Sequence, residues 1–160
     1  MSEIITNSDK QTFALGKKIA KSLKGNAIIG LIGDLGAGKT VFSQGLANGL
    51  GIKKIVNSPT FVLMKVYPIK SRSARILPKA KLFNGVNPVK HKTIKNLVHI
   101  DAYRIKNEQD IINIGAEEYF NQPDTITLIE WADKIKKILP SKTKFIKIEI
   151  LDNNKRRIKY

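Results

Sequence analysis

The feature that most constrains the fold is the unbroken apolar run at 27–32, which reads Ala-Ile-Ile-Gly-Leu-Ile. A run of this kind is typical of a strand that is buried on both faces of a parallel sheet. It leads directly into a turn with three glycines, and a helical pattern then runs from Lys39 to about Leu50, where Gly51 ends it. A strand, a tight turn and a helix in this order predict an α/β fold, because parallel strands need helical crossovers.

Strand and helix patterns alternate along the rest of the 160 residues. Ser8 and Gln11 fit the pattern of a capping box, which predicts a helix that extends to about Leu23. This order favours a three-layer fold in which helices flank a mostly parallel central sheet, and the length favours a single domain over 1–160. Further strands are expected at 61–67, 97–101, 126–130, 144–151 and 156–160, and further helices at 108–120 and 131–139.

The segment at about 68–96 interrupts this alternation. It contains Pro68, Pro78 and Pro88 and shows no sustained hydrophobic period. Such a segment cannot bury enough apolar area to form core. The sequence therefore predicts an insertion or a long loop here, attached to an otherwise regular domain.

The turn after the first apolar run carries a phosphate-binding motif. Residues 33–40 read Gly-Asp-Leu-Gly-Ala-Gly-Lys-Thr and fit the pattern G-x-x-x-x-G-K-[ST] of a P-loop. Glycines let the backbone N–H groups curl around an anion, and the following helix presents its positive end. The alternative, a glycine-rich turn with an incidental lysine, is disfavoured by the position of the motif between a buried strand and a helix. The expected phosphate-binding residues are Gly33, Asp34, Leu35, Gly36, Ala37, Gly38, Lys39 and Thr40.

Two carboxylates are candidates for the metal side of such a site. Asp101 ends the expected strand at 97–101, and Glu130 ends the one at 126–130. Ligands of parallel α/β sheets bind outside the carboxyl ends of the strands, so both side chains could face the phosphates. The alternative for each is a surface carboxylate that caps the next helix. His99 lies within its strand and is expected to be a packed core residue.

The charge of the chain limits the kinds of partner that it can be expected to bind. There are 29 basic and 13 acidic residues, a net charge of +16, and the stretch 65–97 holds nine basic residues and no acid. This asymmetry suits an anionic partner such as RNA. The alternative is the codon bias of an AT-rich genome, because 24 of the 29 basic residues are lysine.

Three absences in the sequence exclude other kinds of site, location and ligand. There is no cysteine, which rules out disulfides, thiolate metal sites and a cysteine nucleophile. No apolar stretch resembles a secretory signal or approaches the length of a membrane span, so a cytoplasmic protein without a membrane partner is expected. Guanine recognition normally uses N-K-x-D, which the sequence lacks, and adenine is therefore favoured over guanine.

Four motifs in order resemble the TsaE (YjeE) family of bacterial ATPases, which takes part in making threonylcarbamoyladenosine next to the anticodon of tRNA. They are the loop at 33–40, Ser-Pro-Thr-Phe at 58–61, His-Ile-Asp-Ala-Tyr-Arg at 99–104 and Leu-Ile-Glu-Trp at 128–131. The resemblance covers nearly the whole chain except about 68–96. It implies a P-loop NTPase-like fold with ATP and Mg2+ as ligands.

The resemblance also implies roles for single residues. Lys39 would lie on the β- and γ-phosphate oxygens, Thr40 and Glu130 on magnesium, and Asp101 would be a carboxylate needed for hydrolysis. Thr60 resembles a switch-like threonine near the γ-phosphate.

Three further positions carry weaker implications. Trp131 is similar to a family tryptophan beside the site, with plain core packing as the alternative. Arg156 matches an arginine near the nucleotide, with a solvated turn residue as the alternative. Val41 stands where many members have a second hydroxyl residue, but its backbone N–H can still meet the α-phosphate.

The family implies an ATPase that is weak alone and works with the TsaB–TsaD pair, with tRNA attracted by the basic insertion. Two other functions are weighed against it. One is a small-molecule P-loop kinase that uses the insertion as a phosphate-closing lid, although the insertion holds only Arg72 and Arg75 as arginines. The other is a basic RNA-binding P-loop module, although the sequence lacks an aromatic-rich stacking surface.

Overall fold

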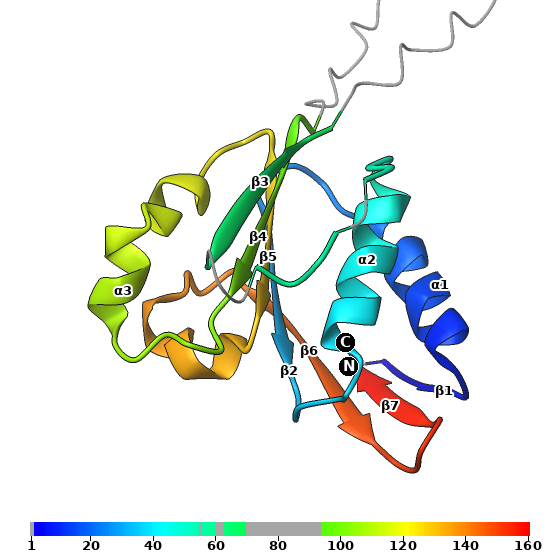
Figure 1. The fold of residues 1–160 in the computed structure, drawn as a ribbon. Helices are drawn as coiled ribbons and strands as arrows, with labels where there is room; N and C mark the ends of the chain where they lie inside the picture. The colour runs from blue at the N-terminus through cyan, green and yellow to red at the C-terminus, as the bar shows by residue number, and fades with distance from the viewer. Residues whose placement is uncertain (1, 55, 60–62, 70–93) are drawn as a thin grey trace, which may run out of the picture.

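The computed structural model describes residues 2–54, 56–59, 63–69 and 94–160. Within them, seven strands form one sheet in the order β1-β7-β6-β2-β5-β4-β3 (Figure 1). The strands are β1 (Glu3–Thr6), β2 (Ala27–Ile32), β3 (Met64–Pro68), β4 (Asn96–Asp101), β5 (Thr125–Glu130), β6 (Lys144–Ile150) and β7 (Arg156–Lys159). The helices are α1 (Asp9–Ala20), α2 (Lys39–Gly49) and α3 (Glu108–Asn113), with 3-10 helices η1 (Ala116–Tyr119) and η2 (Ala132–Ile138).

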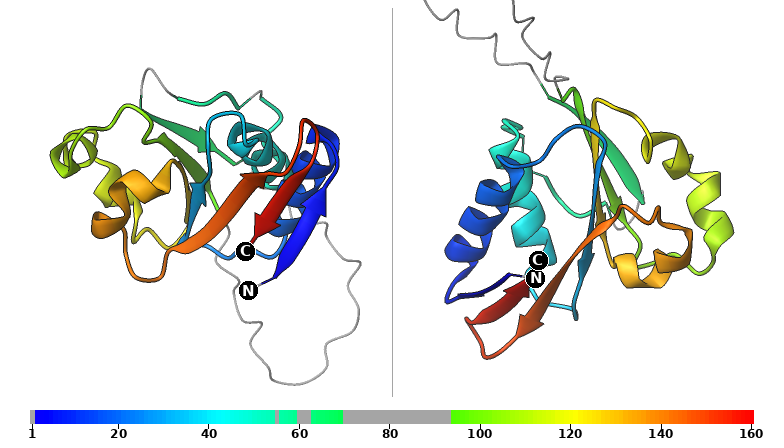
Figure 2. Two further views of the ribbon diagram at one scale, coloured as in Figure 1. Left: turned by 90° about the horizontal axis from the view of Figure 1, so that it is seen from below. Right: turned by 180° about the vertical axis from the view of Figure 1, so that it is seen from behind.

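The centre of the sheet is parallel and its edges are antiparallel. Strand β2 pairs in parallel with β5 and β6, and β5 pairs in parallel with β4. The outer strands β1, β7 and β3 run antiparallel to their neighbours. Helices α1 and α2 cover one face, and α3, η1 and η2 cover the other (Figure 2). The predicted three-layer α/β fold with a mostly parallel central sheet is therefore confirmed.

Two buried clusters hold the layers together. Leu46 of α2 packs with Leu97 and Leu128 of the sheet on the α1–α2 face. Ile111 of α3 packs with Ile129 of the sheet on the opposite face. Both faces of β4 and β5 are thus buried, as their continuous apolar runs require. The carboxyl ends of these strands therefore lie at the edge of a core that is packed on both faces of the sheet.

Helix α2 packs against α1 through glycines that leave no room for a side chain. A Cβ atom added at Gly45 would come within 3.0 Å of the backbone of Phe13, and one added at Gly49 would crowd Lys17 and Ala20. Only hydrogen leaves room for such a close approach of two helix backbones. The glycine-rich turn that begins α2 is therefore anchored to a tightly packed helix pair.

Several expected boundaries were wrong. The edge strand β1 was not expected at all. Helix α1 ends at Ala20 rather than Leu23, and the helix expected at 131–139 is the shorter 3-10 helix η2, which contains a non-helical residue at Ile135. Strand β3 begins at Met64 rather than at 61, and residues 60–62 lie outside the described residues.

Most of the insertion expected at about 68–96 also lies outside the described residues, at 70–93. Its two ends are described and adjacent, since the Ile69 N–H donates to the Lys95 carbonyl at 2.6 Å. In the described part of the chain, no helix is long and apolar enough to cross a membrane.

Candidate active site

The glycine-rich turn between β2 and α2 has a backbone that only glycine accommodates. Gly33, Gly36 and Gly38 have φ angles of 153°, 78° and 98°. A Cβ atom at Gly33 would also collide with the Ile148 carbonyl of β6. Gly38 is the N-cap of α2, and no side chain caps this helix end. The first N–H groups of α2 are therefore left for an anion, which is the arrangement of a phosphate-binding loop.

Lys39 places a buried cation inside this turn. Its side chain is only 5% exposed, and Nζ donates to the carbonyls of Gly33 at 2.6 Å and Asp34 at 2.8 Å. Nζ also lies 3.5 Å from the centre of the Trp131 ring, in a cation–π contact. Burial lowers the pKa of Lys39, and the nearby carboxylates, Glu130 foremost, oppose this effect. The ammonium group is thus held beside the loop without a carboxylate in direct contact.

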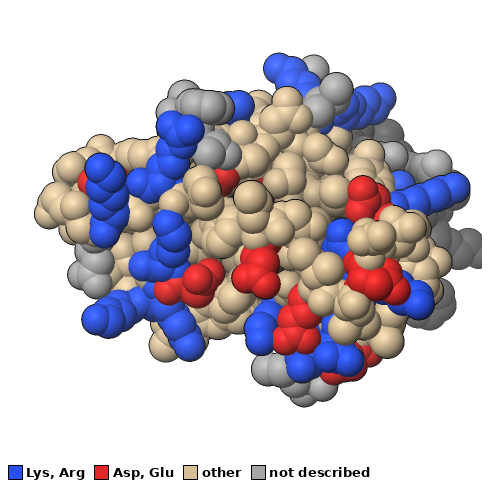
Figure 3. Space-filling view, turned by 60° about the horizontal axis from the view of Figure 1, so that its bottom comes forward, with Lys and Arg blue, Asp and Glu red and all other residues tan. Residues whose placement is uncertain are grey.

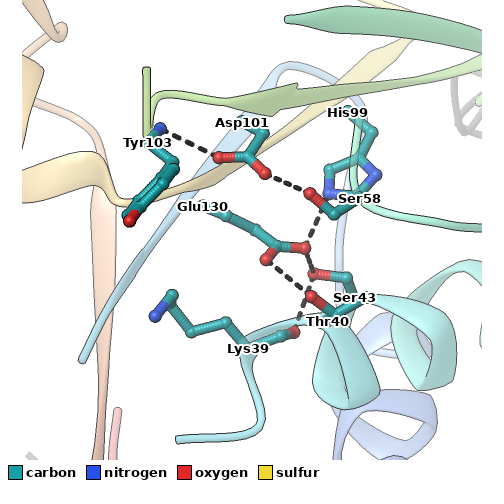
Figure 4. Close-up of polar contacts among 8 residues, drawn as sticks. All are labelled: Lys39, Thr40, Ser43, Ser58, His99, Asp101, Tyr103 and Glu130. Atoms are coloured by element: carbon teal, nitrogen blue, oxygen red, sulfur yellow. Dashed lines mark hydrogen bonds and ion pairs between the residues drawn. The ribbon is translucent and has the colours of Figure 1, made fainter. Parts of the chain in front are cut away.

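Glu130, at the end of β5, is the polar centre of the site. It is 2% exposed, and its Oε2 accepts a hydrogen bond from the Thr40 hydroxyl at 3.0 Å. Its Oε1 lies 2.8 Å from Ser43 Oγ and 2.9 Å from His99 Nε2 (Figure 4). The carboxylate therefore links β5 to the first turn of α2 and to β4.

Asp101, at the end of β4, lies beside Glu130 because the two residues are paired in register. Its Oδ1 accepts from the Tyr103 N–H at 2.9 Å, and its Oδ2 accepts from the Ser58 hydroxyl. The alternative role of these carboxylates as helix caps is wrong. Asn107 caps α3, and η2 has no side-chain cap.

Arg156 and Trp131 both lie at the site. Arg156 Nε donates to the Ala37 carbonyl at 3.1 Å, and Nη2 donates to the Gly36 carbonyl at 3.3 Å. Nη1 of Arg156 also donates to carbonyls of the turn before β7, at Asp152, Asn153 and Lys155, so this side chain joins that turn to the loop. Trp131 has a left-handed φ of 59° and packs against Tyr103, with ring centres 5.1 Å apart.

These residues surround one open cleft of about 420 Å3. Gly33, Asp34 and Ala37 do not line it, but their carbonyls hold Lys39 and Arg156. Thr60 lies outside the described residues. The lining residues are Asp9, Leu35, Gly36, Gly38, Lys39, Thr40, Val41, Ser58, Asp101, Tyr103, Glu130, Trp131 and Arg156.

Sequence reasoning missed Ser43, Asp9 and the polar contact of His99. Ser43 follows Lys39 by four residues, and this helical spacing could have identified it as part of the same face of α2. Asp9 had no such signal, since only the fold brings the start of α1 to the cleft. His99 is fully buried, as expected of a core residue, but its Nε2 also contacts Glu130.

The donor set suits magnesium bound together with phosphates. The described residues contain no group of three or more His, Asp or Glu side chains that could cage a metal by themselves. Mg2+ is usually held by one or two carboxylates, with the remaining ligands from phosphate oxygens and water. The adjacent Thr40 hydroxyl and Glu130 carboxylate fit that pattern.

The described surface near the carboxyl ends of the strands is mixed in charge. Figure 3 shows acidic side chains gathered between groups of lysines and arginines on this side of the molecule. A nucleic-acid surface normally presents basic side chains on one continuous face. The described part of this side does not favour the RNA-binding alternative.

Comparisons with known proteins agree on one family. The model of the family "Threonylcarbamoyl adenosine biosynthesis protein TsaE" matches residues 6–77 and 80–158. A tRNA threonylcarbamoyladenosine biosynthesis protein TsaE of Bacillus subtilis is 36% identical over 155 residues, which cover 97% of this chain and 82% of the relative. The protein of the same name in Treponema pallidum is 30% identical, with 96% of both chains covered.

A solved structure shows the same similarity in three dimensions. The crystal structure of Bacillus subtilis YdiB superposes with a TM-score of 0.68 at 32% sequence identity. The match covers 98% of this chain and 82% of that chain. Both the family model and the structural match extend across the strands and loops that form the cleft.

Proposed function

The chain belongs to the TsaE family, whose members act in tRNA threonylcarbamoyladenosine biosynthesis, and from this premise we propose that its cleft binds and hydrolyses ATP. The observation that carries the proposal is the buried cation of Lys39 inside a glycine turn whose helix end has no side-chain cap. A buried cation and the N–H groups of a helix start without a side-chain cap, gathered in one turn, are complementary to a phosphate chain.

The residues around the cleft have different roles in the proposed binding of ATP. The N–H groups at the start of α2 and the Lys39 ammonium would bind the phosphates. Thr40 and Glu130 would hold Mg2+, which when bound neutralises negative charge on the phosphates. Arg156 keeps the loop in shape, because its guanidinium binds the carbonyls of Gly36 and Ala37.

The two strand-end carboxylates supply the acceptors that hydrolysis needs. Asp101 is held by the Tyr103 N–H and the Ser58 hydroxyl, and Glu130 by the Thr40 hydroxyl. A carboxylate fixed in this way can accept a hydrogen bond from an attacking water and orient it toward the phosphate. Both carboxylates are therefore assigned to hydrolysis more than to nucleotide binding.

We expect low activity from the isolated chain. Arg156 is the only arginine among the described residues that line the cleft, and its donors are already engaged by backbone carbonyls. An arginine that stabilises the transferred phosphoryl group would have to come from elsewhere. We therefore propose that the TsaB–TsaD pair in the cytoplasm stimulates hydrolysis, and that the chain does not itself transfer the threonylcarbamoyl group.

Nucleotide binding tests this proposal directly. ATP and ADP with Mg2+ are titrated by calorimetry and by the emission of Trp131, the single tryptophan, which stacks on the Lys39 ammonium. Lys39→Ala should weaken binding by about 10- to 100-fold, since a hydrogen bond to a charged group contributes about 1.5–3 kcal/mol. Thr40→Ala should weaken binding only when Mg2+ is present.

The matched control is Lys142→Ala, which removes an exposed lysine that contacts Asn26 and Asn121. It should bind nucleotide like the unmodified chain. If Lys39→Ala and Thr40→Ala also bind like the unmodified chain, the assigned site is wrong. Phosphate transfer to a small-molecule acceptor, in place of release to water, would support the kinase alternative.

A further inference from the structure

His99 is a buried titratable residue that the proposed function leaves without a role. It lies in β4, is fully buried, and contacts Glu130 through Nε2 at 2.9 Å from Oε1. The pairing of β4 with β5 explains this contact. Asp101 lies opposite Glu130, and His99 is two residues earlier on the same face of the sheet. A diagonal neighbour on one face is within reach of a long side chain.

The hydrogen-bond chemistry of this contact has one direction. A carboxylate oxygen accepts, so Nε2 of His99 carries the proton that it shares with Oε1 of Glu130. Nδ1 of the same ring is buried, and no partner for it is found among the described residues. In the described part of the chain, Glu130 is therefore the one polar group that orients the imidazole ring.

Ser43 is a second possible donor to the same oxygen of Glu130, but its proton is shared between two acceptors. Its hydroxyl has a single proton and lies near two acceptors, the Lys39 carbonyl at 2.9 Å and Glu130 Oε1 at 2.8 Å. When Ser43 donates within the helix to Lys39, only His99 continues to donate to Oε1. His99 thus holds Oε1 on the inner side and leaves Oε2 directed at Thr40.

We propose that His99 is a positioning residue, which fixes the Glu130 carboxylate so that Oε2 faces the Thr40 hydroxyl at the metal side of the cleft. The inference rests on the proposed function, because it concerns the carboxylate assigned to magnesium. Hydrogen bonds to a metal-side carboxylate orient it, and their loss typically costs about 10- to 100-fold in metal affinity or activity.

Three substitutions of His99 distinguish a role in positioning Glu130 from a role in core packing. His99→Gln places an amide N–H near the position of Nε2, His99→Asn places it near Nδ1, and His99→Leu fills the space without a donor. We expect His99→Leu and His99→Asn to lower kcat, and to raise the Mg2+ concentration for half-maximal ATPase, by about 10- to 100-fold. His99→Gln should restore most of both, and KM for ATP should change little.

The Mg2+ dependence distinguishes a positioning role from a packing role. His99→Leu removes a donor to the buried Glu130 carboxylate, so it should unfold at a lower temperature than His99→Gln whichever role His99 has. A purely structural histidine would lower the amount of folded protein and leave the Mg2+ concentration for half-maximal ATPase unchanged. Equal turnover in His99→Leu and the unmodified chain would overturn the inference and leave the proposed function intact. An unmodified chain without ATPase activity, alone or with the partner pair, would overturn both.

A second readout needs neither nucleotide nor metal. The sequence has two histidines, His91 and His99, so 15N-histidine NMR of the full chain gives two imidazole patterns, and His91→Gln assigns them. The imidazole of His99 should be protonated at Nε2, and Glu130→Ala should shift that proton resonance. A proton on Nδ1, or a resonance that Glu130→Ala does not move, would overturn the inference.

Discussion

Lys39 has the least ordinary environment of the residues in the site. Its ammonium group is nearly excluded from water and is held by two loop carbonyls and the Trp131 ring. Burial lowers the pKa of Lys39 although four carboxylates in the neighbourhood oppose the shift. The charge is therefore unfavourable for folding, and its retention is explained by the phosphate-binding role that we propose.

From the burial of Lys39 we predict how its replacement changes the free energy of unfolding at different pH values. The Lys39→Met variant should have a free energy of unfolding equal to, or up to about 2 kcal/mol above, that of the unmodified chain at pH 7. The folded chain binds fewer protons than the unfolded chain between the lowered pKa and the ordinary value of 10.5, so its stability rises with pH there. The difference between the two proteins should therefore narrow as the pH approaches 10.5.

Urea unfolding of both proteins across this pH range measures the difference. Lys142→Met serves as the control, because Lys142 is exposed and its removal should not stabilise the protein. A Lys39→Met variant that is several kcal/mol less stable would show that the cation contributes to folding.

The individual site residues were predicted to different extents. The loop at 33–40 and the strand-end carboxylates Asp101 and Glu130 follow from local patterns, because spacing and strand ends are visible in the sequence. The contact of His99 with Glu130 was not predictable, since it depends on which strands are neighbours in the sheet. The contact of Arg156 with Gly36 joins residues 120 positions apart, which no local pattern reveals.

At the scale of elements, the packing of α1 against α2 supports the loop. A side chain at Gly45 has no space, because the Phe13 backbone lies against it. Gly45→Ala should lower the free energy of unfolding by about 1–3 kcal/mol, the usual cost of overpacking, in spite of the better helix propensity of alanine.

Thermal unfolding compares this variant with Asn48→Ala, which places alanine on the exposed side of the same helix. The control should be neutral or slightly more stable. A Gly45→Ala variant as stable as the control would mean that the two helices can separate at no cost. Nucleotide affinity measured on both variants then reports whether the helix pair also shapes the loop.

The elements that sequence reasoning missed are those stabilised by distant partners. Strand β1 has only four residues and pairs with β7, where Glu3 lies opposite Lys159 at the other end of the chain. Helix η2 follows Trp131, whose left-handed backbone starts a tighter turn than a regular helix. By contrast, β2, α2, β4 and β5 were predicted closely, because their hydrophobic patterns are long and their ends carry clear signals.

At the scale of the whole molecule, the segment 70–93 can be tested as a separable part. Ile69 and Lys95 are joined by a backbone hydrogen bond, so a short glycine linker could bridge Ile69 and Ile94 without moving β3 or β4. We expect the deletion to leave ATP binding and the unfolding temperature unchanged. The deleted stretch contains many lysines and no acid, so it should contribute weak, salt-sensitive attraction to tRNA.

Filter binding of tRNA at low salt, with the full chain and the deletion variant side by side, measures that attraction. Equal binding by both proteins would remove the electrostatic role and leave the segment as additional length without a part in tRNA binding. Loss of ATP binding in the deletion variant would instead connect the segment to the cleft.

The central claim concerns hydrolysis at the cleft, and phosphate release from ATP by the full chain, alone and with the TsaB–TsaD pair, tests it most directly. We predict slow release by the chain alone and faster release with the pair. Glu130→Ala and Asp101→Ala should each lower kcat by about 100-fold or more, with smaller effects on ATP affinity. Rapid release by the chain alone, or near-normal turnover in both variants with the pair present, would contradict the claim.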